Sequence, residues 1–152
     1  MREREQNMIL ENTRFGTIEV EDDRIITFAK GIPGFEHLTR YVLIVEKEGV
    51  LEYLQSVEEP RLSFILVDPF LYCRDYEFEL SDQTVEDLEI RSEEDLIIRC
   101  ILSIRDEVKN ATMNLVAPIV INAARKLGKQ VILTKTAYGT RHPLFPDQVG
   151  AR

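Results

Sequence analysis

Apolar residues recur in short runs along this chain, and in places they alternate with polar residues. Residues 76–80 alternate apolar side chains with glutamates, whereas residues 96–104 are apolar at almost every position. Because successive side chains of a strand point to opposite faces, the first pattern predicts a strand with one buried face. The second pattern predicts a central strand that is apolar on both faces, with Ile98 and Leu102 in the core.

Two pairs of apolar runs are separated by short polar turns, and each pair predicts a β-hairpin. Residues 15–20 and 24–28 flank three acidic residues. Residues 40–45 and 50–54 flank a turn that ends in Gly49. Glycine suits such a turn because it readily adopts a positive φ. We expect the two strands of each pair to be antiparallel neighbours.

Two further apolar runs, residues 63–67 and 131–133, also predict strands. Pro69 ends the first of them, since proline has no N–H group to donate to a central ladder. Short strands at such regular spacing are typical of an all-β sandwich or barrel. The predicted fold class is therefore mostly β, a small antiparallel β-barrel-like single domain.

Helical signals are scarce. Ser81 or Asp82 can cap a short helix that runs through Leu88, and residues 122–127 can form a second one before Gly128. Both segments are too short to be stable alone, so each would depend on packing against the strands. The sequence therefore predicts one or two short helices.

The composition is that of an ordinary globular protein, with 44% hydrophobic and 30% charged residues in a chain of 152. We expect one domain over residues 1–152, with loose ends before about Met8 and after about Phe145. The sequence shows no export signal and no membrane span, and Cys73 and Cys100 lack metal-ligand spacing. These features predict a cytoplasmic protein with two reduced, unlinked thiols.

The formal net charge is −8, from 19 basic against 27 acidic residues. Phosphate binding draws on clustered lysines and arginines, so direct binding to nucleic acid is disfavoured. An acidic surface speeds the encounter with basic partners, and it also keeps a protein soluble. The charge by itself does not choose between these two uses.

No group of residues in the sequence points to catalysis. His37 and His142 have no neighbours that would form an acid–base pair or a metal site. Phosphate-binding glycine loops, a serine elbow and a zinc-protease helix are absent. The acidic residues within 86–95 lack the ligand pattern of a calcium loop. We therefore predict no catalytic, cofactor-binding or metal-ligating residues.

Two loops combine glycine or proline with apolar side chains, residues 31–36 (GIPGFE) and residues 68–72 (DPFLY). In each loop the apolar side chains either pack into the core or form a shaped, exposed surface. Aromatic residues are enriched at protein interfaces and supply affinity, whereas carboxylates beside them speed association with basic partners. The hypothetical partner-binding surface consists of Asp68, Phe70, Tyr72, Glu77 and Glu79.

Taken in order, six segments resemble those of the FliW flagellar assembly factors. They are residues 31–36 (GIPGFE), 54–56 (LQS), 68–70 (DPF), 75–80 (DYEFEL), 114–122 (NLVAPIVIN) and 128–131 (GKQV). The resemblance in both order and spacing covers about residues 13–144. The two ends of the chain lie outside it.

The resemblance implies a β-barrel-like fold and a regulatory role without chemistry. Members of that family bind CsrA, a small dimeric RNA-binding repressor of flagellin translation, and they also bind flagellin. Flagellin retained in the cytoplasm would occupy the factor and leave CsrA active, whereas flagellin export would free the factor to antagonise CsrA. Two alternatives remain from the residues alone: a small RNA-binding barrel, which the charge opposes, and an unrecognised small enzyme, which lacks a motif.

Overall fold

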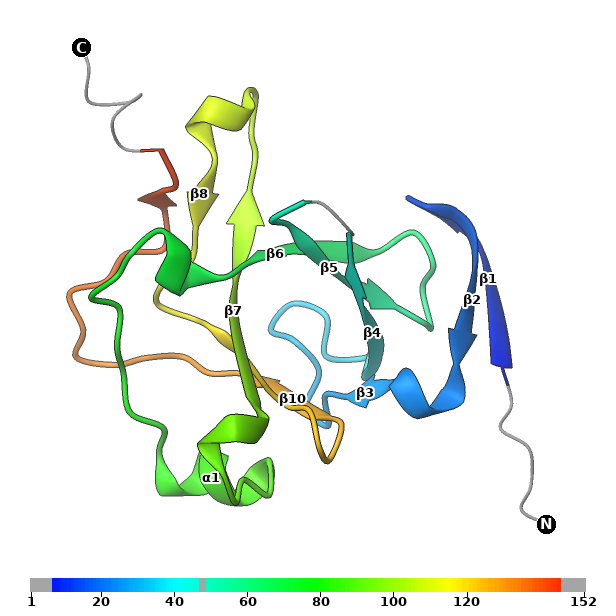
Figure 1. The fold of residues 1–152 in the computed structure, drawn as a ribbon, viewed down its shortest axis with the longest axis horizontal. Helices are drawn as coiled ribbons and strands as arrows, with labels where there is room; N and C mark the ends of the chain where they lie inside the picture. The colour runs from blue at the N-terminus through cyan, green and yellow to red at the C-terminus, as the bar shows by residue number, and fades with distance from the viewer. Residues whose placement is uncertain (1–6, 47–48, 146–152) are drawn as a thin grey trace.

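The computed structural model describes residues 7–46 and 49–145. Within them, seven strands form a closed barrel: β3 (Ile26–Thr27), β4 (Arg40–Val45), β5 (Glu52–Ser56), β6 (Ser63–Val67), β7 (Leu96–Ser103), β9 (Ile119–Asn122) and β10 (Leu127–Gln130). The barrel closes because β7 pairs with both β6 and β9 (Figure 1). Neighbouring strands are antiparallel except β3 and β10, which are parallel. The predicted fold class is confirmed.

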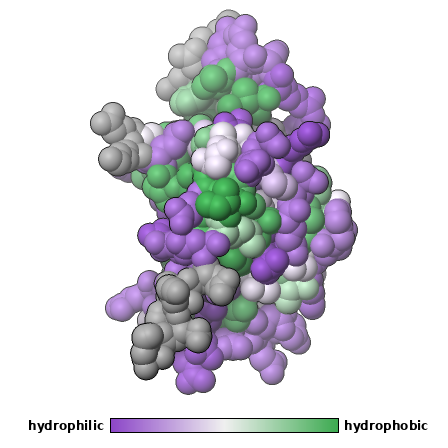
Figure 2. Space-filling view, turned by 90° about the vertical axis from the view of Figure 1, so that its right-hand side faces the viewer, coloured by the Kyte–Doolittle hydropathy of each residue, from purple (hydrophilic) through white to green (hydrophobic). Residues whose placement is uncertain are grey.

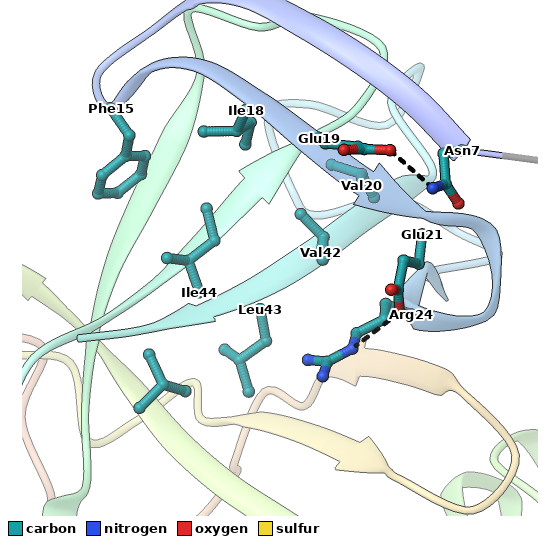
Figure 3. Close-up of a pocket in the computed structure, with 11 residues that line it drawn as sticks. Asn7, Phe15, Ile18, Glu19, Val20, Glu21, Arg24, Val42, Leu43 and Ile44 are labelled. Carbon is teal, nitrogen blue, oxygen red and sulfur yellow. Dashed lines mark hydrogen bonds and ion pairs between the residues drawn. The ribbon is translucent and has the colours of Figure 1, made fainter. Parts of the chain in front are cut away.

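A separate hairpin lies outside the barrel, where β1 (Asn7–Thr13) pairs with β2 (Gly16–Glu21). Leu10 and Val20 of this hairpin pack against Val42 of the barrel. On the side of the molecule that carries the hairpin, apolar side chains gather in the middle of a largely hydrophilic face (Figure 2). A hollow of about 530 Å³ separates β2 from β4 (Figure 3).

The remaining elements of the described residues are short. Beyond the barrel, β7 pairs with β8 (Thr112–Met113), which pairs with β11 (His142–Pro143). The one α-helix of the described residues, α1 (Asp82–Asp87), begins at Ser81, whose Oγ accepts a hydrogen bond from the Thr84 N–H at 3.1 Å. The predicted first helix is therefore confirmed. The 3₁₀ turns are η1 (Asp22–Arg24), η2 (Pro69–Leu71), η3 (Glu93–Asp95) and η4 (Val108–Asn110).

Several predicted strands are confirmed. β4 and β5 form the hairpin expected over residues 40–54, and β6 covers residues 63–67. β7 is central, since it pairs with three other strands. Residues 1–6 and 146–152, expected to be loose, lie outside the described residues, as does part of the turn after β4.

The hairpin predicted over residues 15–28 is wrong. Of the three acidic residues between its two runs, Glu21 ends β2, whereas Asp22 and Asp23 form part of η1, where the chain leaves the hairpin to enter the barrel. β2 pairs with β1, while β3 pairs with β4 and β10. The two runs are buried in different places. Ile26 and Phe28 pack in the barrel core, whereas Val20 packs between the outer hairpin and the outside of the barrel.

The helix predicted at residues 122–127 is also wrong, because β9 and β10 form a hairpin there. The Asn122 side-chain oxygen accepts hydrogen bonds from the Ala124 and Arg125 N–H groups, and Lys126 adopts a positive φ of 58°. An asparagine that bonds to the backbone in this way favours a turn over a helix.

Two other predicted strands lack a full ladder. Residues 76–80 are unassigned to any strand, although their burial alternates as predicted. Residues 131–133 lie past the end of β10, yet the Val131 and Leu133 N–H groups still bond to the Pro118 and Val116 carbonyls. Both segments are extended chain that covers the barrel rather than completing it.

The loop at residues 31–36 is structural. Ile32 is buried and Phe35 is half-buried, and both pack in the barrel core. Gly31 has a φ of +68°, and a Cβ there would lie 2.5 Å from the Glu36 Cα. Only glycine tolerates both this positive φ and the close approach of the Glu36 backbone, so Gly31 is required for the shape of the loop.

The core has two main parts, one inside the barrel and one beneath the covering segments. Tyr41, Leu54 and Ile121 belong to the first, and Cys100 and Leu102 to the second. Cys73 and Cys100 are free thiols. Burial raises the pKa of the Cys100 thiol to about 12, so Cys100 stays protonated at neutral pH.

The predicted core position is confirmed for Leu102, which is only 5% exposed, and is wrong for Ile98, which is half-buried and outside the core clusters. The two residues should therefore differ in their contribution to stability. We expect Leu102→Ala to lower the free energy of unfolding by about 2–5 kcal/mol. Ile98→Ala should lower the free energy of unfolding by about 1 kcal/mol, because the half-buried Ile98 side chain loses less buried apolar surface on truncation. Chemical denaturation measures both, and a larger loss at Ile98 would contradict this assignment.

Candidate functional site

An apolar groove with acidic residues along it lies between the segment after β6, helix α1 and the first half of β7. Its volume is about 820 Å³. We call it the acidic groove and define it by its lining residues, which are Phe70, Tyr76, Glu77, Phe78, Glu79, Leu80, Val85, Ile90, Glu93, Leu96, Ile98 and Arg99. Segments that are distant in sequence thus form one concave surface.

The turn after β6 is held by local bonds. Asp68 caps η2, since its carboxylate accepts a hydrogen bond from the Phe70 N–H at 3.0 Å, and Pro69 occupies the first position of the turn. Arg99 of β7 lies 4.0 Å from the Asp68 carboxylate. Proline fixes φ and an aspartate cap satisfies a free N–H, so this sequence favours a rigid turn.

The turn presents Phe70 to the groove and directs Tyr72 elsewhere. Phe70 is 41% exposed, and its ring centroid lies 5.7 Å from that of Tyr76. Tyr72 is half-buried and packs edge-on against Phe145, away from the groove lining. Phe70 therefore has the exposure of an anchor residue, whereas Tyr72 belongs to the core beneath the turn.

Residues 76–80 form one wall of the groove. The buried Tyr76 hydroxyl donates a hydrogen bond to the Leu115 carbonyl at 2.8 Å, and burial raises its pKa, so it remains a neutral donor. The Glu77 N–H donates to the Tyr138 hydroxyl at 2.9 Å. With this backbone fixed, the Glu77 and Glu79 side chains are exposed while Phe78 is half-buried.

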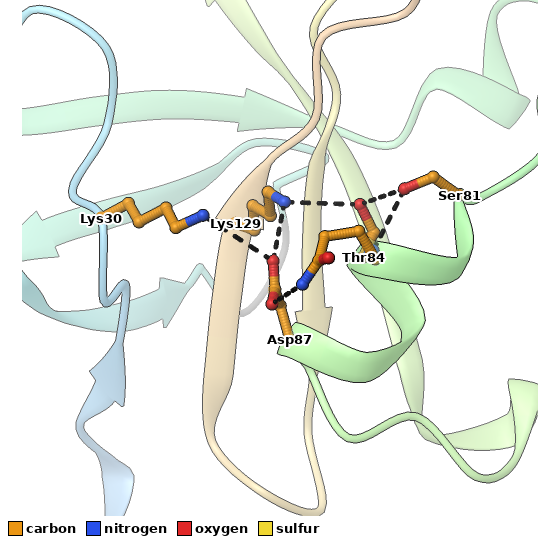
Figure 4. Close-up of polar contacts among 6 residues, drawn as sticks. Lys30, Ser81, Thr84, Asp87 and Lys129 are labelled. Carbon is orange, nitrogen blue, oxygen red and sulfur yellow. Dashed lines mark hydrogen bonds and ion pairs between the residues drawn. The ribbon is translucent and has the colours of Figure 1, made fainter.

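A set of polar contacts fixes α1, which supplies Val85 to the opposite wall (Figure 4). Asp87 accepts hydrogen bonds from the Lys129 ammonium at 3.0 Å and from Gln83 at 2.7 Å. The bond from Gln83, followed by that from Lys129, lowers the pKa of the Asp87 carboxyl. Lys30 lies 4.0 Å from the same carboxylate. The helix is thereby tied to β10.

Asn122 fixes the end of the same helix. It is buried, and its Nδ2 donates hydrogen bonds to the Leu88 carbonyl at 2.8 Å and the Glu89 carbonyl at 3.1 Å. Its Oδ1 accepts from two N–H groups of the turn between β9 and β10. One amide therefore joins the barrel turn to the wall of the groove.

Asn122→Ala should lower the free energy of unfolding by about 1–3 kcal/mol, because buried carbonyl and N–H groups lose their partners. Thermal and chemical denaturation measure the loss. Asn110→Ala is the matched control, since the Asn110 side chain bonds to Asp106 in an exposed position. Equal stability of the two variants would contradict a joining role for Asn122.

Negative charge prevails along the groove. Glu77, Glu79 and Glu93 are exposed, whereas the Arg99 guanidinium is half-buried and bonded to Glu52 at 2.8 Å. Arg99 also approaches Asp68, so its charge is balanced from two sides. The carboxylates at the rim thus remain available to a basic partner.

The structure brings together part of the predicted surface. Phe70, Glu77 and Glu79 line the acidic groove, Asp68 supports it through Arg99, and Tyr72 lies outside the lining. Sequence reasoning missed the apolar floor, which Val85, Ile90, Leu96 and Ile98 provide. The available signals were the apolar positions of the predicted helix and of the predicted strand 96–104, and Ile90 within the acidic stretch 86–95.

Among the described residues, no three His, Cys, Asp or Glu side chains gather where they could hold a metal ion. No helix in the described part of the chain is long and apolar enough to cross a membrane.

Comparison with known proteins gives one family throughout. The family model described as "FliW protein" matches residues 9–144. A flagellar assembly factor FliW from Geobacillus kaustophilus is 47% identical over 134 residues, covering 88% of this chain and 93% of the relative. One from Natranaerobius thermophilus is 40% identical over 143 residues, covering 93% and 95%.

A solved structure supports the same assignment. The crystal structure of the flagellar assembly factor FliW is 44% identical in sequence and superposes with a TM-score of 0.87. The match covers 91% of this chain and 98% of that one. The family model spans the residues that build the groove, and the chain belongs to the FliW family of flagellar assembly factors.

Proposed function

We propose that this chain acts in the cytoplasm as a binding protein, and not as an enzyme, that antagonises CsrA and also binds flagellin. Synthesis of flagellin would follow filament assembly by exchange of these two partners. The observation that carries the proposal is the acidic groove, in which an exposed aromatic residue lies beside carboxylates on a rigid wall. These groups suit the binding of another protein rather than a chemical reaction.

Each part of the groove has a physical role in this proposal. The apolar floor and Phe70 supply affinity, because burial of aromatic and aliphatic surface dominates the energy of interfaces. The rim carboxylates Glu77 and Glu79 speed the encounter with a basic protein. A net charge of −8 also repels RNA phosphates, so a basic RNA-binding partner would be held apart from its RNA.

The exchange mechanism predicts that CsrA and flagellin each bind the purified chain and that flagellin displaces CsrA. The test is size-exclusion chromatography of the chain with each partner alone and with both together. CsrA should elute free once flagellin is in excess, and it should then recover its binding to target RNA. A stable complex of all three proteins in excess flagellin would contradict exchange, and failure to bind either partner would overturn the proposed function.

A further inference from the structure

Strand β4 has an open edge at its C-terminal end. It pairs with β5 along its whole length, from Tyr41 opposite Ser56 to Val45 opposite Glu52. On its other side it pairs with β3 at Arg40 and Tyr41 alone within the described residues. The chain preceding β3 turns away there as η1, so β4 continues beyond its neighbour.

The hydrogen-bonding direction of each residue follows from the register. The Arg40 carbonyl accepts from the Val57 N–H at 3.1 Å, on the β5 side, whereas the Thr39 carbonyl accepts from the Phe28 N–H at 2.7 Å, on the β3 side. Directions alternate along an antiparallel strand, so Leu43 and Val45 present their N–H and C=O groups away from β5. In the described part of the chain these groups have no backbone partner.

This edge opens into the hollow between β4 and the outer hairpin, which residues 42–45 line on one side and residues 18–21 on the other (Figure 3). Ile18 and Ile44 give the hollow apolar surface, and Val45 is 60% exposed. Unpaired strand edges beside apolar surface are templates for pairing with another chain.

The negative charge around the hollow favours a basic partner over a second copy of this chain. Residues 19–24 contain four carboxylates against a single guanidinium, that of Arg24, which pairs with Glu21 at 3.8 Å. A second copy of this chain would bring the same carboxylates against one another, which disfavours pairing. A strand with lysine or arginine at alternate positions would instead meet opposite charge.

We propose that β4 is a docking edge for an extended segment of a partner protein in which basic and apolar residues alternate. The segment adds as a strand beside Leu43 and Val45, as in other cases of β-strand addition. The basic side chains lie on the same face as Val42 and Ile44, where they meet the carboxylates of residues 19–23 on the outer hairpin. The apolar ones lie on the opposite face of the strand, where they cover Leu43 and Val45. This goes beyond the acidic groove, because β4 and β7 are separated around the barrel by two strands on one side and three on the other.

The test uses the full ¹⁵N-labelled chain and a defined probe, the acetylated and amidated peptide Lys-Val-Lys-Val-Lys-Val. We expect amide shifts at Leu43, Val45 and β2, together with at least tenfold slower hydrogen exchange at the first two amides. Val45→Pro should abolish these effects, since it removes an outward N–H without breaking the β5 ladder. Val45→Ala keeps that N–H and should retain them. A Glu-Val peptide of equal length should bind at least tenfold more weakly.

The proposal is overturned if the Lys-Val peptide leaves these amides unchanged, if it shifts the acidic groove instead, or if Val45→Pro binds it as well as the natural chain does. It is also overturned if the two amides become protected with rising concentration of the free chain, because a second copy would then cover the edge. The probe contains neither CsrA nor flagellin, so these outcomes are independent of the proposed function.

Discussion

Phe70→Ala is expected to weaken the proposed binding of CsrA by at least about tenfold, or about 1.4 kcal/mol, while the domain stays folded. The reason is that Phe70 is 41% exposed and belongs to no core cluster of the described residues, and its ring centroid lies 5.7 Å from that of Tyr76. Its truncation removes an anchor without opening either core cluster. Isothermal titration calorimetry measures the affinity, and chemical denaturation should show a loss of stability below about 1 kcal/mol.

Leu71→Ala is the matched control, because Leu71 lies beside Phe70 on the same turn, is 63% exposed and does not line the groove. It should bind nearly as the natural chain does. If Phe70→Ala unfolds before it loses its partner, Phe70 is a core residue and the acidic groove is the wrong surface.

The double reversal Glu77→Lys and Glu79→Lys probes the rim of the same groove. It should slow CsrA association in low salt, with little change in thermal stability, because both side chains are exposed. The effect should fade as salt screens the charges. Association at the natural rate in low salt would show that these carboxylates do not face the partner.

Gly128→Ala is expected to lower the free energy of unfolding by about 3 kcal/mol, by overpacking. Gly128 pairs with Ile121 in the barrel wall, and a Cβ there would lie 2.5 Å from Cζ of Phe28. Phe28 is fully buried, so its ring has little room to move away. Thermal and chemical denaturation should both report the loss.

Gly139→Ala is the control for this substitution, since its added Cβ would come no closer than 4.0 Å to the Arg141 nitrogen. It should leave stability unchanged within about 0.5 kcal/mol. Phe28→Leu in the Gly128→Ala background should recover part of the loss, because the two sites share one space. Additive losses would contradict a direct clash between them.

Part of the candidate site could be predicted from sequence. The Asp68-Pro69 turn and the exposed Glu77 and Glu79 follow from local rules, since proline, a capping carboxylate and a period of two act over adjacent residues. Tyr72 could not be separated from Phe70 in this way. The positions of the Tyr72 and Phe70 rings depend on contacts with Phe145 and Tyr76, respectively, which lie in other segments.

The sequence by itself determined the β class, the strands β4 to β7, a short helix capped by Ser81 or Asp82, and the family. Only the tertiary structure decided that β2 pairs with β1, that residues 122–127 turn between two strands, and that α1 and β7 enclose the acidic groove. Strand periodicity and helix caps are properties of neighbouring residues. Strand partners and concave surfaces instead depend on which distant apolar faces bury one another, and a local pattern does not specify that choice.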